Sequence, residues 1–594
     1  MYLNHKDLSK YWILDIEADD LKATRIWLVV ATNAATGETL DFVDRETFNR
    51  FVDAHQDCYW VGHNAISYDL PTLRRLWGSR LNLDRCVDTL VLSYLYDPQM
   101  VGGHSLAAWG ERFGLPKIDF HDFSQYSEKM LEYCKRDVEL TLRVFKALTA
   151  RMLKRGWSEK SCKIEHDIRV VLDKQEANGF YFDIDGAQHL RSKLDEKRDG
   201  LEKGIHALFP PELVIQKSYE YRTKQDGEPT HHYLRHGEVY PKLTHNTDGT
   251  YDVWDYQAFN IGSPKQRLDR LLRMGFKPTK KTKTGGPSVD EDSLVEFAAS
   301  AKIPEVAAIA EYLVLSGRSN MLGTWLNCVD VVDSRMRGRV FTCGASTRRM
   351  THSSPNTANI PKAHEKVPYG KECRSLWTVS DTNSRRLVGY DAAGLEMRMF
   401  AHYLGIPEVA ELYVNGDPHQ VNADLLGIER STVKNVFYAF LYGAANEKLG
   451  NTGGHNAKWG KNARALLVEK TPGLKDLMRL VQYEQERGFL ETIDGGMVRC
   501  PSPHAALNYK LQSAGGITMK VASIILDQRA QEKGLDHMKV GDIHDEGQHD
   551  VAISDADELG KMAVQSIRDA GEELNFSVPL DGDYKVGLSW AETH

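Results

Sequence analysis

Two acidic motifs stand at the ends of apolar segments far apart in this chain, and they constrain its fold more than any other feature. Asp391 ends the apolar segment that begins at Arg386, and this pattern predicts a strand. A second predicted strand, from about Met538, runs into Asp545 and Glu546. Two acids delivered by separate strand ends are what nucleotidyl transfer requires, since one cation lowers the pKa of a primer 3′-hydroxyl and another neutralises a triphosphate.

The segment between these acids carries a basic and aromatic stripe. Side chains recur there at a spacing of four residues: Arg430, Lys434, Tyr438 and Tyr442. A helix would place all of them on one face. Cations followed by phenols suit a nucleoside triphosphate, with charge at the phosphates and aromatic surface beside the base and sugar. An ordinary amphipathic helix with a solvated basic end explains the stripe taken alone, but the flanking acids favour nucleotide binding.

A further acidic set lies near the N-terminus. Asp15 and Glu17 alternate along a predicted strand and therefore point to one face. Tyr133 and Asp137 are four residues apart on a predicted helix and share a face, and Asp69 adds another carboxylate. Such oxygen ligands can hold two divalent cations, while the phenol orients a water against a phosphodiester. A chance Asp-x-Glu pair is the alternative for the first two acids alone.

Composition limits the class of protein. The chain has 594 residues, of which 41% are hydrophobic, and this is enough for several independent cores. With 75 Lys+Arg against 83 Asp+Glu, the net charge of −8 argues against a simple nucleic-acid coat protein but allows DNA binding in a basic groove. The eight cysteines are scattered, and no apolar run reaches the roughly 18 residues of a membrane span. We therefore expect a monomeric cytoplasmic enzyme.

The N-terminal acids and their surroundings resemble the DEDD exonucleases, in the subclass that carries a Tyr. The segment His104-Ser105-Leu106-Ala107-Ala108-Trp109-Gly110 is similar to one in the proofreading domain of phage replicative polymerases. The resemblance implies that the metal ligands are Asp15, Glu17, Asp69 and Asp137, with Tyr133 also catalytic. Asp88 could pass for a ligand, but we favour a structural role for it.

The order of motifs along nearly the whole chain resembles the family A DNA polymerases, and most closely the replicative polymerases of the T-seven-like phages. Three motifs carry the resemblance: Asp391 to Glu396 as motif A, Arg430 to Gly443 as motif B, and His544-Asp545-Glu546 as motif C. Other similar segments are Thr347-Arg348-Arg349, Gly416-Asp417-Pro418-His419, Ser502-Pro503-His504-Ala505-Ala506-Leu507-Asn508 and Leu511-Gln512-Ser513-Ala514-Gly515.

The resemblance implies roles for the matching residues at the reacting phosphates. Asp391 and Asp545 would bind the cations, two Mg²⁺ ions per active site with Mn²⁺ able to substitute. Glu546 would assist beside the primer end. The triphosphate would be held by Arg430, Lys434 and His419.

Further roles concern the nucleotide and the DNA. Tyr438 would stack at the nucleotide sugar with Glu396 beneath it, and Tyr442 would lie near the templating base. Three side chains would contact primer–template DNA in the minor groove, where every base pair offers acceptors: Arg349, Asn508 and Gln512.

The implied fold class is α/β plus α, with an RNase H-like 3′–5′ exonuclease domain followed by a right-hand polymerase. We predict the exonuclease at 1–155 and the thumb at 156–330. The palm is predicted at 331–415 and 491–594, and the fingers at 416–490. The implied activity is template-directed addition of deoxynucleotides with 3′–5′ proofreading, as in a phage replicative polymerase.

Residues 209–258 form a polar, aromatic-rich excursion within the predicted thumb. Asp226-Gly227 and Asp248-Gly249 are hairpin signals, and the aromatic residues are Tyr219, Tyr221, Tyr233, Tyr240, Tyr251, Trp254 and Tyr256. We expect the segment to guide DNA or to bind a small accessory protein. Thioredoxin is one candidate, since the phage relatives recruit it at an insertion in the thumb. The alternative is a self-packed β-decoration without a partner.

One residue departs from the family pattern. The relatives carry Asp-Gly-Arg where this chain has Asp494-Gly495-Gly496, so one expected DNA-contacting Arg is missing, and Arg499 is the candidate to replace it. The sequence argues against three rival functions. Glu396 would crowd a ribose 2′-hydroxyl and argues against a single-subunit RNA polymerase. Intact acids at both centres argue against an inactive DNA-binding accessory protein, and a pure nuclease leaves most of the chain unexplained.

Overall fold

The computed structural model describes the chain apart from residues 1, 4, 6, 279–285, 288, 290 and 303, and apart from the side chains of 291, 292, 301, 304 and 305. The chain forms two compact units. The first consists of Met1–Phe182, Cys328–Lys362 and Arg374–His594, and the second of Asp183–Asn327 and Ala363–Cys373.

The N-terminal part of the first unit is built on a mixed five-stranded sheet, as its α/β pattern predicts. The strand order is β3-β2-β1-β4-β5, in which β1, β2 and β3 pair antiparallel and β1, β4 and β5 pair parallel. The strands are β1 (Tyr11–Ala18), β2 (Ile26–Asn33), β3 (Thr39–Phe42), β4 (Tyr59–Gly62) and β5 (Cys86–Asp88). The helices are α1 (Arg45–Ala54), α2 (Asp69–Trp77), α3 (Thr89–Tyr96), α4 (Leu106–Phe113) and α5 (Glu128–Lys154).

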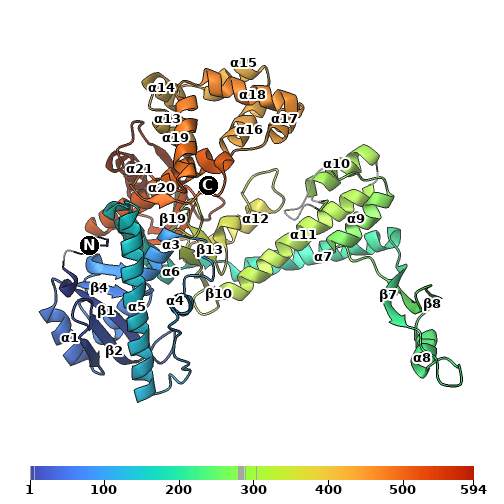
Figure 1. Ribbon diagram of the computed structural model, residues 1–594. Helices are drawn as coiled ribbons and strands as arrows, with labels where there is room; N and C mark the ends of the chain where they lie inside the picture. The colour runs from blue at the N-terminus through green and yellow to red at the C-terminus, as the bar shows by residue number, and fades with distance from the viewer. Residues whose placement is uncertain are drawn as a thin grey trace. The chain divides into compact units, whose positions relative to one another are not determined.

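Alternation along β1 decides where its acids point. Tyr11 and Ile13 pack into the hydrophobic cluster that includes the buried side of α5, whereas Trp12 and Leu14 pack into the cluster on the other face. Asp15 continues the odd-numbered series, so it faces α5, which crosses this sheet in Figure 1.

A second sheet in the first unit brings together strands from distant parts of the sequence. Its order is β18-β19-β15-β20, with every pairing antiparallel. The strands are β15 (Arg385–Ala392), β18 (His537–Ile543), β19 (Glu546–Ala552) and β20 (Gly582–Gly587). Helix α21 (Ala556–Glu573) packs on β15 and β20, and α20 (Ala506–Glu532) packs against α21. The predicted strands at Asp391 and from Met538 are confirmed, and they share this sheet.

Helices fill the sequence between β15 and α20, and α16 confirms the predicted helix from Arg430. They are α13 (Leu395–Leu404), α14 (Pro407–Asn415), α15 (Pro418–Leu426), α16 (Arg430–Leu441), α17 (Asn446–Thr452), α18 (Ala457–Lys470) and α19 (Leu474–Glu486). The other elements of this unit are α6 (Glu159–Asn178), β6 (Phe180–Phe182), β10 (Val329–Asp330), β11 (Arg335–Met336), β12 (Arg339–Phe341), β13 (Thr351–Ser353), β14 (Trp377–Thr378), β16 (Leu490–Glu491) and β17 (Met497–Val498).

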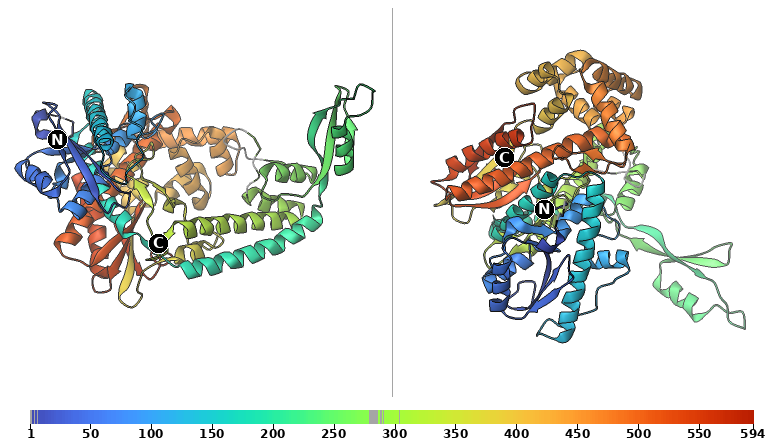
Figure 2. Two further views of the ribbon diagram at one scale, coloured as in Figure 1. Left: turned by 90° about the horizontal axis from the view of Figure 1, so that it is seen from below. Right: turned by 60° about the vertical axis from the view of Figure 1, so that its left-hand side comes forward.

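The second unit is organised around two long helices, α7 (Ile184–Leu208) and α11 (Pro304–Cys328), which lie side by side in both Figure 1 and Figure 2. The pair is antiparallel, because Ser319 Oγ donates to Asp195 Oδ1 at 2.7 Å while Arg191 lies beside Gly323. This unit also contains α9 (Pro264–Arg273), α10 (Glu291–Ala301) and most of α12 (Gly370–Ser375).

The excursion at 209–258 belongs to this second unit and forms a three-stranded antiparallel sheet of order β7-β9-β8 with one helix. Its elements are β7 (Glu212–Glu220), α8 (His231–Val239), β8 (Lys242–His245) and β9 (Thr250–Gln257). The turn at Asp248-Gly249 joins β8 to β9, as predicted. Tyr251 is buried and packs against Tyr219, Tyr221 and Tyr233, so much of the aromatic surface is used within the excursion.

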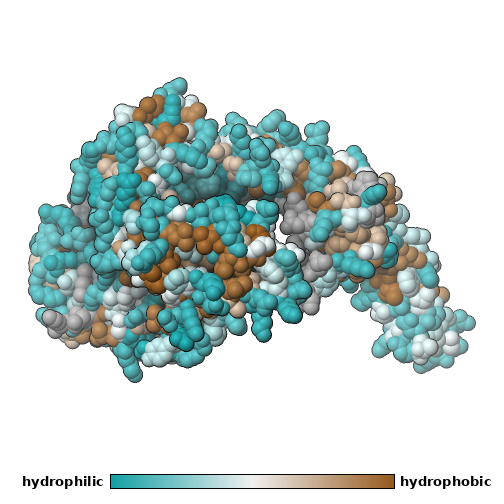
Figure 3. Space-filling model, turned by 90° about the horizontal axis from the view of Figure 1, so that it is seen from above, coloured by the Kyte–Doolittle hydropathy of each residue, from teal (hydrophilic) through white to brown (hydrophobic). Residues whose placement is uncertain are grey.

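The hydropathy of the helices and of the surface is the last feature of the fold that bears on membrane contact. No helix among the described residues is both long enough and apolar enough to cross a bilayer. The face shown in Figure 3 is largely hydrophilic, with hydrophobic side chains gathered in limited patches.

Candidate active sites

The antiparallel sheet brings the motif A and motif C acids together. Asp391 lies directly opposite Glu546 in the register of β15 and β19. The backbone N–H of Ala392 donates to the carbonyl of Asp545 at 3.2 Å. His544 takes a left-handed φ of 58° in the turn between β18 and β19, which reverses the chain within two residues. The acids that the sequence predicted as partners therefore meet at one end of the sheet.

Charge repulsion at this sheet end favours a bound cation. The pKa of Asp391 is raised to about 7. Partial burial is the larger cause, and the negative charges of Asp545 and Glu546 are the next. A divalent ion would relieve that repulsion, and carboxylate oxygens are the ligands that Mg²⁺ and similar hard cations prefer. The donor set at this centre thus fits a metal.

Glu546 differs from the other two acids because protein groups already hold its carboxylate. Gln548 Nε2 donates to Oε1 at 2.6 Å, and the Trp590 indole N–H donates to the same oxygen. His594 Nδ1 lies 2.6 Å from Oε2. Sequence reasoning missed Trp590 and His594, since no motif links them to the acid. The side chain expected beside the primer end is therefore buried and fixed in orientation.

The basic and aromatic stripe forms on α16 as predicted. Its first member, Arg430, pairs with Asp417 through Nε and Oδ2 at 2.7 Å, and more than half of the Arg430 side chain is exposed. His419 lies on the preceding helix, α15, and the centre of its ring is 6.1 Å from that of Tyr438. Lys434 is exposed one turn before that tyrosine. The structure thus gathers the expected triphosphate-binding side chains, with Asp417 as a partner that the sequence did not predict.

Glu396 links motif A to the end of the stripe. Its Oε2 accepts a hydrogen bond from the Tyr442 hydroxyl at 2.6 Å, and its Oε1 accepts one from Arg349 Nη2 at 3.2 Å. Gly443 follows at a φ of +74°, and a Cβ there would lie 1.9 Å from the carbonyl oxygen of His504. The chain must therefore have glycine directly after Tyr442.

The predicted DNA-contacting residues share one face of α20. Asn508 and Gln512 are one turn apart on this helix. Arg349, from the segment before β13, packs against α20 one turn after Gln512. Its Cγ is so close to Gly516 that a Cβ added to this glycine would lie 3.4 Å from it. Asn508 Oδ1 is buried without a hydrogen-bond partner among the described residues. The three side chains thus lie along α20 in the order Asn508, Gln512 and Arg349, and of these three it is Arg349 that contacts Glu396.

The N-terminal acids also come together, from three different elements. Asp15 and Glu17 lie on β1, Asp69 begins α2, and Tyr133 and Asp137 lie on α5. The Ile16 N–H donates to Asp69 Oδ1 at 3.2 Å and ties the start of α2 to β1.

Burial and mutual repulsion dominate the electrostatics of this N-terminal cluster. Burial, followed by neighbouring carboxylates, raises the pKa of Glu17 to about 8 and that of Asp69 to about 7, and it raises the pKa of Asp15 as well. Burial also raises the pKa of Asp137, although Lys117 opposes the shift. Such a set of acids favours cations, and its oxygen donors fit hard divalent ions.

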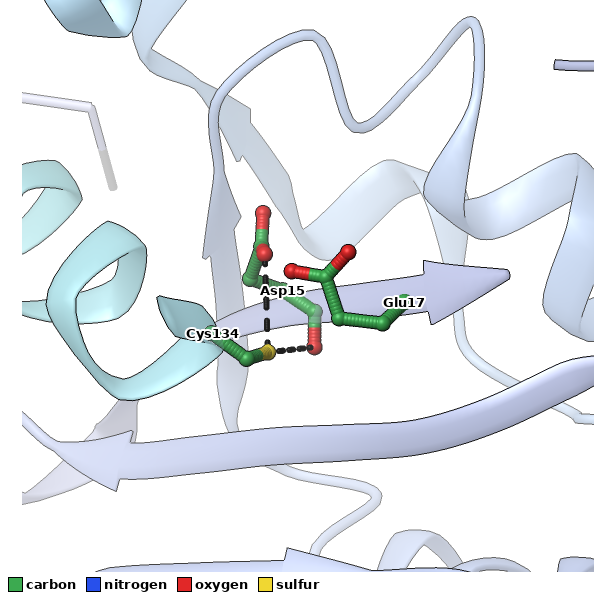
Figure 4. A group of neighbouring side chains, drawn as sticks. All are labelled: Asp15, Glu17 and Cys134. Atoms are coloured by element: carbon green, nitrogen blue, oxygen red, sulfur yellow. Dashed lines mark hydrogen bonds between the residues drawn. The ribbon is translucent and has the colours of Figure 1, made fainter. Parts of the chain in front are cut away.

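Two residues of this site were missed by sequence reasoning. Lys117 Nζ pairs with Asp137 Oδ2 at 2.5 Å and lies 4.6 Å from the centre of the Tyr133 ring. Cys134 Sγ lies 3.5 Å from Asp15 Oδ2, and Figure 4 shows it beside Asp15 and Glu17. Cys134 could have been found because it lies three residues before Asp137 on one helix, whereas no signal in the sequence indicates Lys117.

Asp88 has the structural role that we favoured. Its Oδ1 accepts from the backbone N–H groups of Asn64 and Leu90, each at 2.9 Å, and its Oδ2 accepts from that of Ile66 at 3.1 Å. Asp88 caps α3 and holds the loop before α2 in place.

The surroundings of Gly496 reveal a residue that the sequence did not indicate. Arg499 is 70% exposed and its Nη1 lies 3.6 Å from Asp97 Oδ2, so its replacement of the missing arginine stays a prediction. The guanidinium beside Gly496 is that of Arg348, whose Nη1 would lie 2.7 Å from a Cβ at that position. The sequence could not show this, because residues 348 and 496 meet only in the folded chain.

The sheet with its acids at one end, together with the helix of cations and phenols, defines a nucleotidyl-transferring polymerase. The family model described as DNA polymerase family A matches residues 236–592. The chain belongs to this family and is a DNA-directed DNA polymerase, and enzymes of the family depend on metal ions.

Three similar proteins illustrate the relationship. The DNA-directed DNA polymerase of Enterobacteria phage T3 is 29% identical, over 98% of this chain and 100% of its own length, and the values for Escherichia phage T7 are the same. The solved structure "POL domain of Pol1 from M. smegmatis complex with DNA primer-template and dNTP" has a TM-score of 0.75 at 19% identity, covering 98% of this chain and 95% of that one. This last likeness concerns the fold.

Proposed function

We propose that the chain adds deoxynucleotides to a primer 3′-hydroxyl on a DNA template and removes 3′ ends in a separate N-terminal exonuclease site. The observation that carries this proposal is the presence of two carboxylate clusters on two different sheets, each with pKa values raised by burial and like charge. The fit to phage replicative polymerases follows from the two phage relatives, which match over their full length.

At the polymerase centre, Asp391 and Asp545 would hold two Mg²⁺ ions, which when bound activate the primer hydroxyl and neutralise the departing pyrophosphate. Glu546, fixed by Trp590 and Gln548, keeps a constant orientation beside them. A bound triphosphate would compete with Asp417 for the Arg430 guanidinium, because both are anions.

The remaining nucleotide contacts come from α15, α16 and α13. Lys434 and His419 would contact phosphate oxygens, and Tyr438 would stack at the sugar. Glu396 would exclude a 2′-hydroxyl from the space beneath that sugar, while Tyr442 lies near the templating base. Primer–template DNA would be contacted from the minor groove by Arg349, Asn508 and Gln512.

At the exonuclease centre, Asp15, Glu17, Asp69 and Asp137 would hold two Mg²⁺ ions. The metals would supply the charge that activates a water and stabilises the leaving 3′-oxygen. The Tyr133 hydroxyl would position that water. The burial of Glu17, Asp69 and Asp137 limits how many waters reach the acids, so the positioned water would be one of few.

The domain assignment follows from this division of roles. We place the exonuclease at 1–155, the thumb at 156–330, the palm at 331–415 and 491–594, and the fingers at 416–490. Helices α15 to α19 make up the proposed fingers, and the sheet β18-β19-β15-β20 makes up the proposed palm.

We further propose that the excursion at 209–258 guides DNA or binds a small accessory protein, with thioredoxin as one candidate. Tyr256 is 63% exposed and Val239 is also 63% exposed, so apolar surface is available although the central tyrosines are packed within the excursion. A self-packed decoration without a partner is the competing interpretation.

A single assay tests the proposed activities. A labelled primer–template with a matched or a mismatched 3′ end is incubated with Mg²⁺, with and without deoxynucleotides. We expect extension of the matched primer with nucleotides, and shortening of both primers without them. Extension without any shortening would contradict the exonuclease proposal.

A further inference from the structure

A cluster of four charged side chains is buried beneath the polymerase centre and has no assigned role. Arg348 Nη2 donates to Glu165 Oε1 at 2.7 Å, and Arg348 Nη1 lies 2.8 Å from Asp494 Oδ2. Lys520 Nζ donates to Glu165 Oε1 at 2.7 Å. All four side chains are at most 1% exposed, so the charges are held by one another and not by water.

The cluster also fixes an unfavourable backbone conformation. Arg348 has a φ of +60°, a left-handed conformation that costs a residue with a Cβ about 1 kcal/mol or more. Lys520 Nζ donates to the Arg348 carbonyl oxygen at 2.9 Å, and the Arg348 N–H donates to the carbonyl of Ala345 at 2.8 Å. The peptides before and after Arg348 are therefore each anchored by one hydrogen bond, and the second of them leads into Arg349.

Gly496 leaves room for this guanidinium. A Cβ at position 496 would lie 2.7 Å from Arg348 Nη1 and 2.3 Å from Ser161 Oγ, so no side chain can coexist there with Arg348 as it stands. The family pattern predicts an arginine at 496. In this chain the positive charge beside Asp494 comes from the segment before β13 instead.

We infer that Arg348 is a positioning residue of the polymerase: it occupies the space of a side chain at 496 and locks the backbone that aims Arg349 at the primer site. Arg349 reaches Glu396 and packs on Gly516 of α20, so a small change in its backbone moves the guanidinium away from both. The inference rests on the proposed contact of Arg349 with primer–template DNA.

The first test compares Arg348→Met and Arg349→Ala with the double variant. Affinity for primer–template and single-nucleotide extension are measured at a temperature at which circular dichroism shows each protein to be folded. If Arg348 acts through Arg349, each single change weakens primer–template binding about tenfold, and the double variant is no worse than Arg349→Ala. A normal affinity for Arg349→Ala would refute the proposed DNA contact itself. Normal binding by Arg348→Met, or additive losses in the double variant, would refute the inference alone.

A reciprocal exchange keeps the inference testable if Arg348→Met does not fold. Gly496→Arg alone should be inactive or unfolded because the two guanidinium groups collide. Combined with Arg348→Gly, which suits the left-handed φ, it should recover extension to within about threefold of the original protein. A double variant as poor as Gly496→Arg would overturn the shared-space argument.

A matched control removes a buried ion pair elsewhere in the same unit. Arg385→Met breaks the pair with Asp550 on β19, at the opposite end of the strand from Asp391. It should lower thermal stability while primer–template affinity stays within about twofold. An equal loss of affinity in this control would show that general destabilisation explains the Arg348 variants.

Discussion

The carboxylates of the N-terminal cluster and those at the end of β15 are surrounded in different ways. Glu17, Asp69 and Asp137 are all at most 6% exposed, and Lys117 already neutralises part of their charge. Asp391 is exposed, and among the residues that the structure describes, side-chain donors hold the carboxylate of Glu546 but none is seen at that of Asp545. The proposed exonuclease site is thus buried and partly neutralised, whereas the acid that ends β15 is accessible to a nucleotide.

The largest expected effect separates the two regions. Asp545→Ala removes a proposed metal ligand from the open site, so extension should fall by about three orders of magnitude or more. Shortening of the primer without nucleotides should remain within about twofold, because no ligand of the buried site is altered. Initial rates on a labelled primer measure both. The control is Asp536→Ala, which removes an acid nearby in the sequence whose side chain is 66% exposed. This variant should extend the primer normally.

A smaller effect concerns the space that the open site leaves beneath the sugar. Glu396→Ala removes the acceptor of both Tyr442 and Arg349, and it creates room for a 2′-hydroxyl. We expect incorporation of ribonucleotides relative to deoxynucleotides to rise about tenfold or more. Tyr442→Phe keeps Glu396 and should change this ratio much less. Unchanged selectivity in Glu396→Ala would contradict the role assigned to this acid.

The sequence predicted the members of each site better than their surroundings. The acids and the α16 stripe could be predicted because strand ends, alternation and a spacing of four residues fix where side chains point. Lys117, Trp590 and His594 could not, since their contacts depend on tertiary packing between distant segments. The same reason explains Gly496: only the fold shows that Arg348 fills its space.

The excursion at 209–258 lies outside both acidic sites, and its removal should have a modest effect. Replacing 212–255 by a short Gly/Ser linker should leave single-nucleotide addition unchanged, since no proposed catalytic residue lies there. If the excursion holds DNA or a partner, the product made per binding event should shorten several-fold in the presence of a heparin trap. The measurement is made with and without host extract. Equal product lengths in every case would favour a self-packed decoration.

The smallest effect follows from the raised pKa values of the buried site. In the folded protein the pKa values of Glu17 and Asp69 are about 8 and about 7, whereas their ordinary values are near 4. Between about pH 4 and pH 8, the metal-free folded protein therefore binds more protons than the unfolded protein. In EDTA the stability that these two acids contribute is therefore full below about pH 4 and is lost progressively up to about pH 8. Mg²⁺ should offset this loss, raising Tm by roughly 3 °C more at pH 8 than at pH 6. Asp15→Asn with Glu17→Gln should remove the N-terminal share of that difference and leave only the part that comes from Asp391. A difference as large as in the original protein would contradict the site.

The most direct measurement of two independent centres in one chain uses a primer with a mismatched 3′ end. Asp15→Ala combined with Glu17→Ala is compared with Asp391→Ala, with all four deoxynucleotides and Mg²⁺ present. The account predicts that the first variant leaves the mismatched end in place while extending a matched primer normally. It predicts that the second removes the mismatch and adds nothing. Removal of the mismatch by the first variant, or extension by the second, would contradict the account.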